Sequence, residues 1–290
     1  MLVSLAITFL LLLSTTLSAG LNTQQNEDFD PLTDVEVTVD INAIRTLEKS
    51  DFGLVPLDKI DLFSDPDFYV KIIINDEEFT SETWENTKYI YDTPFSATLN
   101  VPDDQEIVDI TIQLWDKHPS GDRLCDISNN RDSFDKNFDI DLSYSIKSGH
   151  WTGEDMINYD IGWFYPDPSG YGRLNGCDDG STYQSNRDCE LWFDIHQNDY
   201  DGDGIPYWTE VNVYDTDPEV DNRGEDADED GVPIEWEHKW GHFMYENWRD
   251  GGVEHFWFYD PFTWEDHKNL DHDNDGLSNY EEYLTSQWGS

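Results

Sequence analysis

Hydrophobic and polar residues alternate along several short stretches in the first two thirds of the chain. The runs from Val35 to Ile41 and from Val108 to Leu114 place an apolar side chain at every second position. This period of two is typical of a strand that buries one face, because successive side chains of a strand point to opposite sides. Shorter apolar stretches predict further strands at Phe68 to Ile74, Tyr89 to Tyr91, Phe95 to Leu99, Phe138 to Leu142, and Leu191 to Ile195.

These expected strands are separated by turns rich in Asp, Gly, Pro and Ser. Many short strands with turns between them are the pattern of an antiparallel β-sandwich. We therefore predict a mostly β protein, with the sandwich over residues 34–196.

After Asn198 the pattern changes to Asp-rich loops, each followed by a short aromatic stretch. The stretches from Tyr207 to Tyr214, Ile234 to Trp240 and Asn279 to Gln287 each have room for one or two helical turns. Helices this short are not stable alone, and the segment has few apolar residues with which to build a core. Residues 197–290 are therefore predicted to need another source of order.

Residues Met1 to Ala19 have the form of a signal peptide. An apolar stretch from Leu5 to Leu13 is followed by small residues that end near Ala19. We expect cleavage there, a polar linker over residues 20–33, and a secreted or cell-surface protein. An uncleaved membrane anchor is the alternative, although the stretch is shorter than the roughly 20 apolar residues of a spanning helix.

Acidic residues far outnumber basic ones. The chain has 64 Asp and Glu against 16 Lys and Arg, which gives a formal net charge of −48. Such a charge repels the phosphates of nucleic acid, so nucleic acid is excluded as a partner. Cations are the expected partners.

The chain contains three cysteines, Cys125, Cys177 and Cys189. An exported protein can oxidise a pair of them, and Cys177 and Cys189 bracket a loop rich in small polar residues. Pairing of these two is our first expectation, and three unpaired thiols are the alternative. The absence of any Cys-x-x-Cys sequence excludes a zinc ribbon.

Three segments match the pattern Asp-x-Asp-x-Asp-Gly-x5-Glu, whose acidic side chains are spaced to surround one calcium ion. A backbone carbonyl at the seventh position completes each set. The expected calcium ligands are Asp199, Asp201, Asp203, Ile205 and Glu210 in loop 1; Asp226, Asp228, Asp230, Val232 and Glu237 in loop 2; and Asp271, Asp273, Asp275, Leu277 and Glu282 in loop 3.

Calcium requires six to eight hard oxygen ligands, and the alternate residues of a tight loop direct their carboxylates to one centre. The glycine at the sixth position allows the turn, and the final Glu supplies two oxygens. A single acidic turn is expected by chance in so acidic a chain, whereas three complete matches are not. Magnesium is the rival ion, but it needs a stricter octahedron with several retained waters. Ca²⁺ is therefore the predicted cofactor.

The loops resemble the thrombospondin type 3 repeats of bacteria and archaea, which are relatives of the EF-hand loop. The resemblance implies an irregular array of calcium-binding loops with short helices over about residues 197–290. It is carried by Gly204-Ile-Pro206, Asp215-Thr-Asp-Pro218, Gly231-Val-Pro233 and Gly276-Leu-Ser-Asn279. Pro206 and Pro233 lack the backbone N–H that joins paired EF-hand loops, so opening of the calmodulin kind is not implied.

The segment from Ser64 to Lys71, together with Leu114-Trp-Asp116 and Asp122, resembles the C2 domains of protein kinase C and synaptotagmin. In that family, Asp residues from two loops at one end of the sandwich bind calcium. The resemblance implies a further calcium site formed by Asp65 and Asp116, with Asp61 and Asp122 as helpers. His118 stands where the family usually has another Asp. An ordinary turn that opens a strand is the alternative reading of Ser64 to Pro66.

No motif indicates an enzyme. His238 and His242 are four residues apart, but the glutamate of His-Glu-x-x-His is missing, and the chain has no Gly-x-Ser-x-Gly elbow. We therefore predict a non-enzymatic, exported, calcium-binding structural or adhesion protein that contacts another protein, a glycan or a lipid headgroup through its sandwich. The alternative is the non-catalytic front portion of a larger secreted protease or glycosidase, since the chain ends soon after Glu282.

Overall fold

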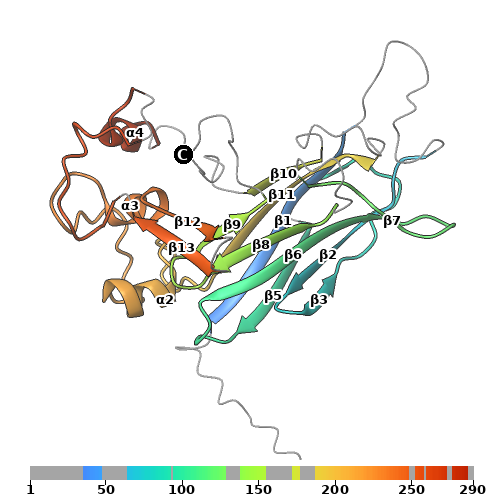
Figure 1. The fold of residues 1–290 in the computed structure, drawn as a ribbon, viewed down its shortest axis with the longest axis horizontal. Helices are drawn as coiled ribbons and strands as arrows, with labels where there is room; N and C mark the ends of the chain where they lie inside the picture. The colour runs from blue at the N-terminus through green and yellow to red at the C-terminus, as the bar shows by residue number, and fades with distance from the viewer. Residues whose placement is uncertain are drawn as a thin grey trace, which may run out of the picture. The chain divides into compact units, whose positions relative to one another are not determined.

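A computed structural model of the protein contains two antiparallel β-sheets, followed by a segment of loops and short helices (Figure 1). The structure describes residues 35–47, 64–92, 94–128, 138–154, 172–176, 187–247, 252–257, 259–272 and 276–286. The predicted signal peptide and linker lie outside these residues, as do Asp61, Cys177, Asp273 and Asp275.

The first sheet is built around β1 (Val35–Thr46), which pairs with β11 on one side and with both β4 and β5 on the other. All of these pairings are antiparallel. The other strands of the sheet are β4 (Tyr89–Ile90), β5 (Phe95–Val101), β10 (Gly172–Asn175) and β11 (Cys189–Gln197).

The second sheet has the order β3-β2-β6-β8-β9, and β7 pairs with the C-terminal end of β6. It too is antiparallel throughout. Its strands are β2 (Phe68–Ile74), β3 (Glu77–Thr80), β6 (Ile107–Asp116), β7 (Arg123–Leu124), β8 (Ile140–Ser145) and β9 (His150–Gly153).

The core consists of the apolar faces of both sheets, which form one buried cluster. In β6 the apolar residues from Val108 to Leu114 are buried, while Asp109 between them is exposed. The same alternation runs along β1 from Val35 to Ile41. Burial of one face therefore sets the strand register, as the period of two predicts. The prediction of a mostly β protein with an antiparallel sandwich is confirmed.

After β11 the chain forms short helices and one hairpin. The α2–η2 pair and α3 begin and end where the aromatic stretches predict, and α4 begins at the expected Asn279 and reaches Ser286, the last described residue. The elements are α2 (Tyr207–Thr209), the π-helical turn η2 (Glu210–Tyr214), α3 (Ile234–Trp240), β12 (His242–Asn247), β13 (Gly252–Trp257) and α4 (Asn279–Ser286). The hairpin of β12 and β13 was not predicted, because its aromatic and polar residues follow no period of two.

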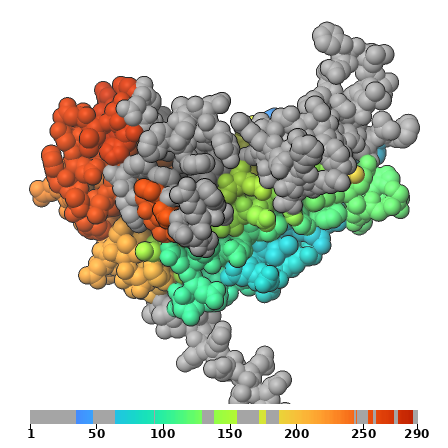
Figure 2. Space-filling view, in the orientation of Figure 1, coloured from blue at the N-terminus to red at the C-terminus, as the bar shows by residue number. Residues whose placement is uncertain are grey.

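Two small apolar clusters lie in this C-terminal segment. One joins Ile205, Tyr214 and Ile234, and the other is centred on Val232, Trp236 and Tyr259. Figure 2 shows the segment, coloured orange to red, gathered on one side of the view beside strands coloured blue to green. Its apolar packing is far smaller than that of the sandwich, which agrees with the prediction that it needs another source of order.

The segment contacts the sandwich through α2 and the end of α3. Thr209 Oγ1 donates a hydrogen bond to the carbonyl of Lys147 at 2.9 Å, and Trp208 packs against the sandwich core. His150 of β9 lies 3.2 Å from the carbonyl of Lys239. The domain boundary at residues 196 and 197 stays a prediction. Among the described residues, no helix combines the length and the apolar character that crossing a membrane requires.

Cys125 and Cys189 are both buried and carry free thiols, and they hydrogen-bond to each other. Burial, followed by the contact with Cys125, raises the pKa of the Cys189 thiol well above its usual value. Cys177, the expected partner of Cys189, lies outside the described residues. The spacing along the sequence favoured Cys177 as the partner of Cys189. The fold places Cys189 beside Cys125.

Truncation of the core should destabilise the sandwich. Leu114 is fully buried in β6, so Leu114→Ala is expected to lower the free energy of unfolding by about 2–5 kcal/mol, through lost burial and the cavity left behind. Val220 is exposed, and Val220→Ala should change stability by about 0.5 kcal/mol or less. Denaturant titration of both variants measures the difference, and equal midpoints would contradict the assignment of the core.

Candidate metal centre

Loop 1 is folded by hydrogen bonds from its own backbone to its first three acidic residues. The carboxylate of Asp199 accepts from Gly202 N at 2.8 Å and from Gly204 N at 2.9 Å. Asp203 accepts from Ile205 N at 2.7 Å. Gly204 has a φ of 96°, a conformation that favours glycine. The loop therefore holds its acidic side chains on one side of a tight turn.

Loop 2 repeats this arrangement at the equivalent positions. Gly231 N donates to Asp226 at 2.9 Å, Val232 N donates to Asp230 at 3.0 Å, and Gly231 has a φ of 104°. The fourth position is also left-handed in both loops, with a φ of 76° at Gly202 and 65° at Glu229. Two segments with different intervening residues thus adopt the same backbone.

The carboxylates of each loop converge. In loop 1, ligand atoms of Asp199, Asp201 and Asp203 all lie within 4.8 Å of one another. In loop 2 the same holds for Asp226, Asp228 and Asp230. Each cluster is therefore a group of oxygens that could hold a metal ion.

The closing glutamate of each loop is buried. Glu210, at the start of η2, is fully buried, and its Oε2 has no hydrogen-bond partner among the described residues. Glu237, in α3, is also fully buried and, within the same part of the chain, has neither carboxylate oxygen hydrogen-bonded. The same is true of Oδ2 in Asp201 and in Asp228. Buried oxygens without a donor are costly, so these sites fit a bound cation.

The electrostatics of loops 1 and 2 point the same way. The pKa of Glu210 is raised to about 7, mainly by burial; the hydrogen bond from Thr216 lowers it, and the charges of the three loop Asp residues add to the rise. In loop 2, burial followed by neighbouring carboxylates raises the pKa of Glu237 to about 7. Each loop thus holds more negative charge than its own hydrogen-bond donors can compensate.

Each of these two loops is also contacted by a segment further along the chain. Asn222 N donates to Asp203 Oδ2 at 3.1 Å, and Glu265 N donates to Asp230 Oδ2 at 3.2 Å. The fifth residue of each loop is therefore fixed from two sides. This long-range contact could not be predicted, since it depends on how the chain returns after each helix.

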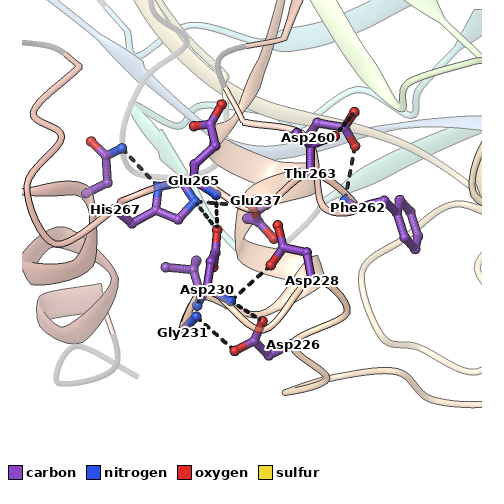
Figure 3. Close-up of polar contacts among 12 residues, drawn as sticks. Asp226, Asp228, Asp230, Gly231, Glu237, Asp260, Phe262, Thr263, Glu265 and His267 are labelled. Carbon is purple, nitrogen blue, oxygen red and sulfur yellow. Dashed lines mark hydrogen bonds and ion pairs between the residues drawn. The ribbon is translucent and has the colours of Figure 1, made fainter.

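Loop 2 receives a second distant residue, His267, which Figure 3 shows beside Asp230 and Glu237. His267 Nε2 lies 2.9 Å from Asp230 Oδ2 and 3.4 Å from Glu237 Oε1, and all three side chains are fully buried. Together they form a third group that could hold a metal ion. Sequence reasoning missed His267, because no local pattern connects it to a loop that ends thirty residues earlier.

Loop 3 is described in part. Gly276 N donates to Asp271 Oδ2 at 3.1 Å, and Gly276 has a φ of 102°, as at the sixth position of loops 1 and 2. Glu282 lies in α4 and is partly exposed. Leu277 is 41% exposed, whereas Ile205 and Val232 at the equivalent position are fully buried. The described part of loop 3 therefore shares the turn of loops 1 and 2 but is more exposed to solvent.

The described sandwich carboxylates that were predicted to bind calcium contact cationic or hydroxyl groups of the protein. Asp116 is fully buried and forms an ion pair with Arg123 at 2.5 Å, and Asp65 lies 3.4 Å from Lys88 Nζ. Asp122 accepts a hydrogen bond from the hydroxyl of Tyr69 at 3.0 Å. Within the described residues, none of the three belongs to a group that could hold a metal ion. The structure therefore offers no geometry in favour of the predicted sandwich site.

His238 and His242 do not form a zinc pair of the His-Glu-x-x-His kind. His238 Nδ1 contacts the hydroxyl of Tyr214 at 2.8 Å, and His242 Nε2 contacts Nδ1 of His255 at 2.8 Å. The ring of His150 packs against both histidines, with centroids 5.3 and 4.5 Å away. Burial lowers the pKa of His238 and of His242. Both histidines are parts of the packing between the sandwich and the C-terminal segment.

No protein-family model and no curated protein matches the sequence. The resemblance of the loops to thrombospondin type 3 repeats and EF-hand loops therefore stays a prediction. Similar solved structures cover 57% of this chain and include C2 domains, as the segment around Ser64 to Lys71 led us to expect.

A structure of a C2 domain is 11% identical with a TM-score of 0.32, and the match covers 98% of that chain. A calcium-bound structure of the paired C2 domains of extended-synaptotagmin 2 is 13% identical with a TM-score of 0.29, over 45% of that chain. Human GIVD cytosolic phospholipase A2 is 14% identical with a TM-score of 0.32, over only 16% of its length. TM-scores of this size carry no conclusion about function.

The raised pKa of Glu210 predicts a pH-dependent response to calcium. Without metal, the protonated carboxyl stabilises the folded state fully below about pH 4.5, and this contribution is lost as the pH rises through about 7. A cation binds the ionised carboxylate, so its stabilising effect should grow over the same range. We expect the calcium-induced rise in melting temperature to be larger at about pH 8 than at about pH 5.5. Thermal scans with calcium and with chelator test this, and a smaller rise at the higher pH would contradict it.

Proposed function

We propose that this chain is an exported calcium-binding structural or interaction protein, in which Ca²⁺ orders the loops of the C-terminal segment. The observation that carries the proposal is the repeated convergence of buried carboxylates at loops 1 and 2, with a buried closing glutamate in each. Both loops adopt the same backbone conformation, which directs their acidic side chains to one centre in each. No catalytic role is part of the proposal.

Calcium is favoured over magnesium by the number and type of oxygens within reach. Loop 1 offers three Asp carboxylates, the two oxygens of Glu210 and the carbonyl of Ile205. Such a set, made almost wholly by the protein, suits the six to eight ligands of calcium, whereas magnesium usually keeps several waters. The order of ligands along each loop supports an array of the thrombospondin type 3 kind.

Contacts between α2 and the sandwich support a mechanical role for the ion in loop 1. Glu210 follows Thr209, whose hydroxyl is hydrogen-bonded to Lys147 between β8 and β9. An ion that fixes Glu210 therefore also fixes the point at which the C-terminal segment meets the sandwich. We infer that calcium fixes how the C-terminal segment is attached to the sandwich, and thereby which surface of the sandwich its partner can reach. We take this partner to be another protein, a glycan or a lipid headgroup.

The expected affinity fits an extracellular setting. Extracellular calcium modules bind with dissociation constants of about 10⁻⁴–10⁻³ M. At ten times that constant, binding stabilises the folded state by about 1.4 kcal/mol per site, or roughly 4 kcal/mol for three sites. The predicted signal peptide is consistent with a location where calcium is this abundant.

Removal of one ligand should abolish the contribution of one site. Millimolar calcium is expected to raise the melting temperature of the intact protein by roughly 8–16 °C for about 4 kcal/mol. Glu210→Gln keeps the size of the side chain but removes the charge that binds calcium in loop 1. The calcium-induced rise should then be smaller by about 3–6 °C, as differential scanning calorimetry would show.

Glu219→Gln is the matched control, because Glu219 is exposed and lies outside the loop. It should leave the calcium-induced rise unchanged. Equal calcium responses in the wild type and in Glu210→Gln would contradict the proposal.

A further inference from the structure

We propose that loop 2 holds a transition-metal ion of the zinc type, bound by Asp230, Glu237 and His267, rather than the calcium ion that loop 1 takes. The three residues come from three places in the sequence: the loop, α3, and the segment before loop 3. Figure 3 shows their side chains directed toward one another.

The spacing of the ligand atoms matches a coordination shell. His267 Nε2 is 2.9 Å from Asp230 Oδ2 and 3.4 Å from Glu237 Oε1. Adjacent ligands around an ion with bonds of about 2.0–2.2 Å are separated by about 3 Å, so one small ion reaches all three atoms.

The burial of this group also points to a ligand. The side chains of Asp230, Glu237 and His267 are wholly inaccessible to solvent. Both oxygens of Glu237 are buried without a hydrogen-bond partner among the described residues, and so is Oε2 of the neighbouring Glu265. A buried carboxylate needs a cation or donors, and the one imidazole present cannot compensate this many carboxylates.

Loop 1 lacks the nitrogen ligand. Asn222 contacts Asp203 as Glu265 contacts Asp230, so the two returning segments correspond. Two residues after Asn222 stands Gly224, whereas two residues after Glu265 stands His267. The loops share their acidic positions and differ in the imidazole. Imidazole is a preferred ligand of zinc and related ions, whereas sites made only of oxygen suit calcium and magnesium.

Binding through Nε2 requires the neutral tautomer of His267 that carries its proton on Nδ1. Nδ1 of His267 lies 3.1 Å from Nδ2 of Asn279, and this amide orients the ring. When the ion takes the Nε2 lone pair, the ring proton resides on Nδ1, the nitrogen that faces the side-chain amide of Asn279. A ligating histidine normally has such a partner on its other nitrogen. No redox change is involved.

This inference rests on the proposed function only in treating loop 2 as a metal loop. Cobalt(II) is a spectroscopic substitute for zinc, so the experiment titrates Co²⁺ into the intact, chelator-stripped protein in the presence of excess calcium. We expect one Co²⁺ per chain with visible ligand-field bands, which an equivalent of Zn²⁺ removes. His267→Gln and Glu237→Gln should each weaken Co²⁺ binding by at least about tenfold and change the bands, since each removes a ligand.

Two matched variants serve as controls. Glu210→Gln alters loop 1 and should leave the cobalt spectrum unchanged while reducing the calcium response. His196→Gln removes an exposed histidine that also lies beside a carboxylate, Asp40, and should have no effect. Circular dichroism verifies that each variant is folded.

The proposal is overturned if His267→Gln leaves the bands and the affinity as they are, or if the wild type binds no Co²⁺ while loop 1 responds to calcium. The proposed calcium function fails separately, if calcium stabilises neither the wild type nor any variant.

Discussion

Repulsion between carboxylates held close together is the constraint that governs the C-terminal segment. Two like charges about 4 Å apart repel by about 4 kcal/mol at an effective dielectric constant of 20. Loops 1 and 2 bring three Asp side chains into such proximity and add a buried glutamate to each group. The two small apolar clusters of the segment offer little to offset this cost. A bound divalent cation turns the repulsion into attraction, and the loop geometry is then stable.

The sandwich depends on a different interaction. Its two sheets bury one continuous apolar cluster, and its buried carboxylates Asp116 and Glu190 are paired with arginines. We therefore expect its fold to be independent of metal. The hydrogen bond from Thr209 to the carbonyl of Lys147 joins the C-terminal segment, which we propose calcium orders, to the sandwich. A protein of this design would be sensitive to the calcium around it without changing the fold of its sandwich.

Much of this arrangement could be predicted from local patterns. The period of two located β1 and β6, and the spacing of Asp, Gly and Glu located loops 1 and 2, because these features depend on neighbours in the sequence. The features that could not be predicted depend on contacts between segments that are distant in the sequence. They are the hairpin of β12 and β13, the contact of Cys189 with Cys125, and the contact of His267 with loop 2. Distant contacts also decide the environment of the sandwich carboxylates that were predicted to bind calcium. Sequence resemblance suggested Asp65 and Asp116 as ligands, whereas the fold gives each a cationic partner from another segment.

Hydrogen exchange of the loop amides tests the central claim most directly. The amides of Gly204 and Ile205 donate to carboxylates of loop 1, so they report whether that loop is closed. In the intact protein, millimolar calcium should slow their exchange by about tenfold or more relative to chelator, because binding raises the free energy of local opening. The amide of Ile112, in the centre of the sandwich, should exchange at the same rate in both conditions. Equal exchange of Gly204 and Ile205 with and without calcium would contradict the account.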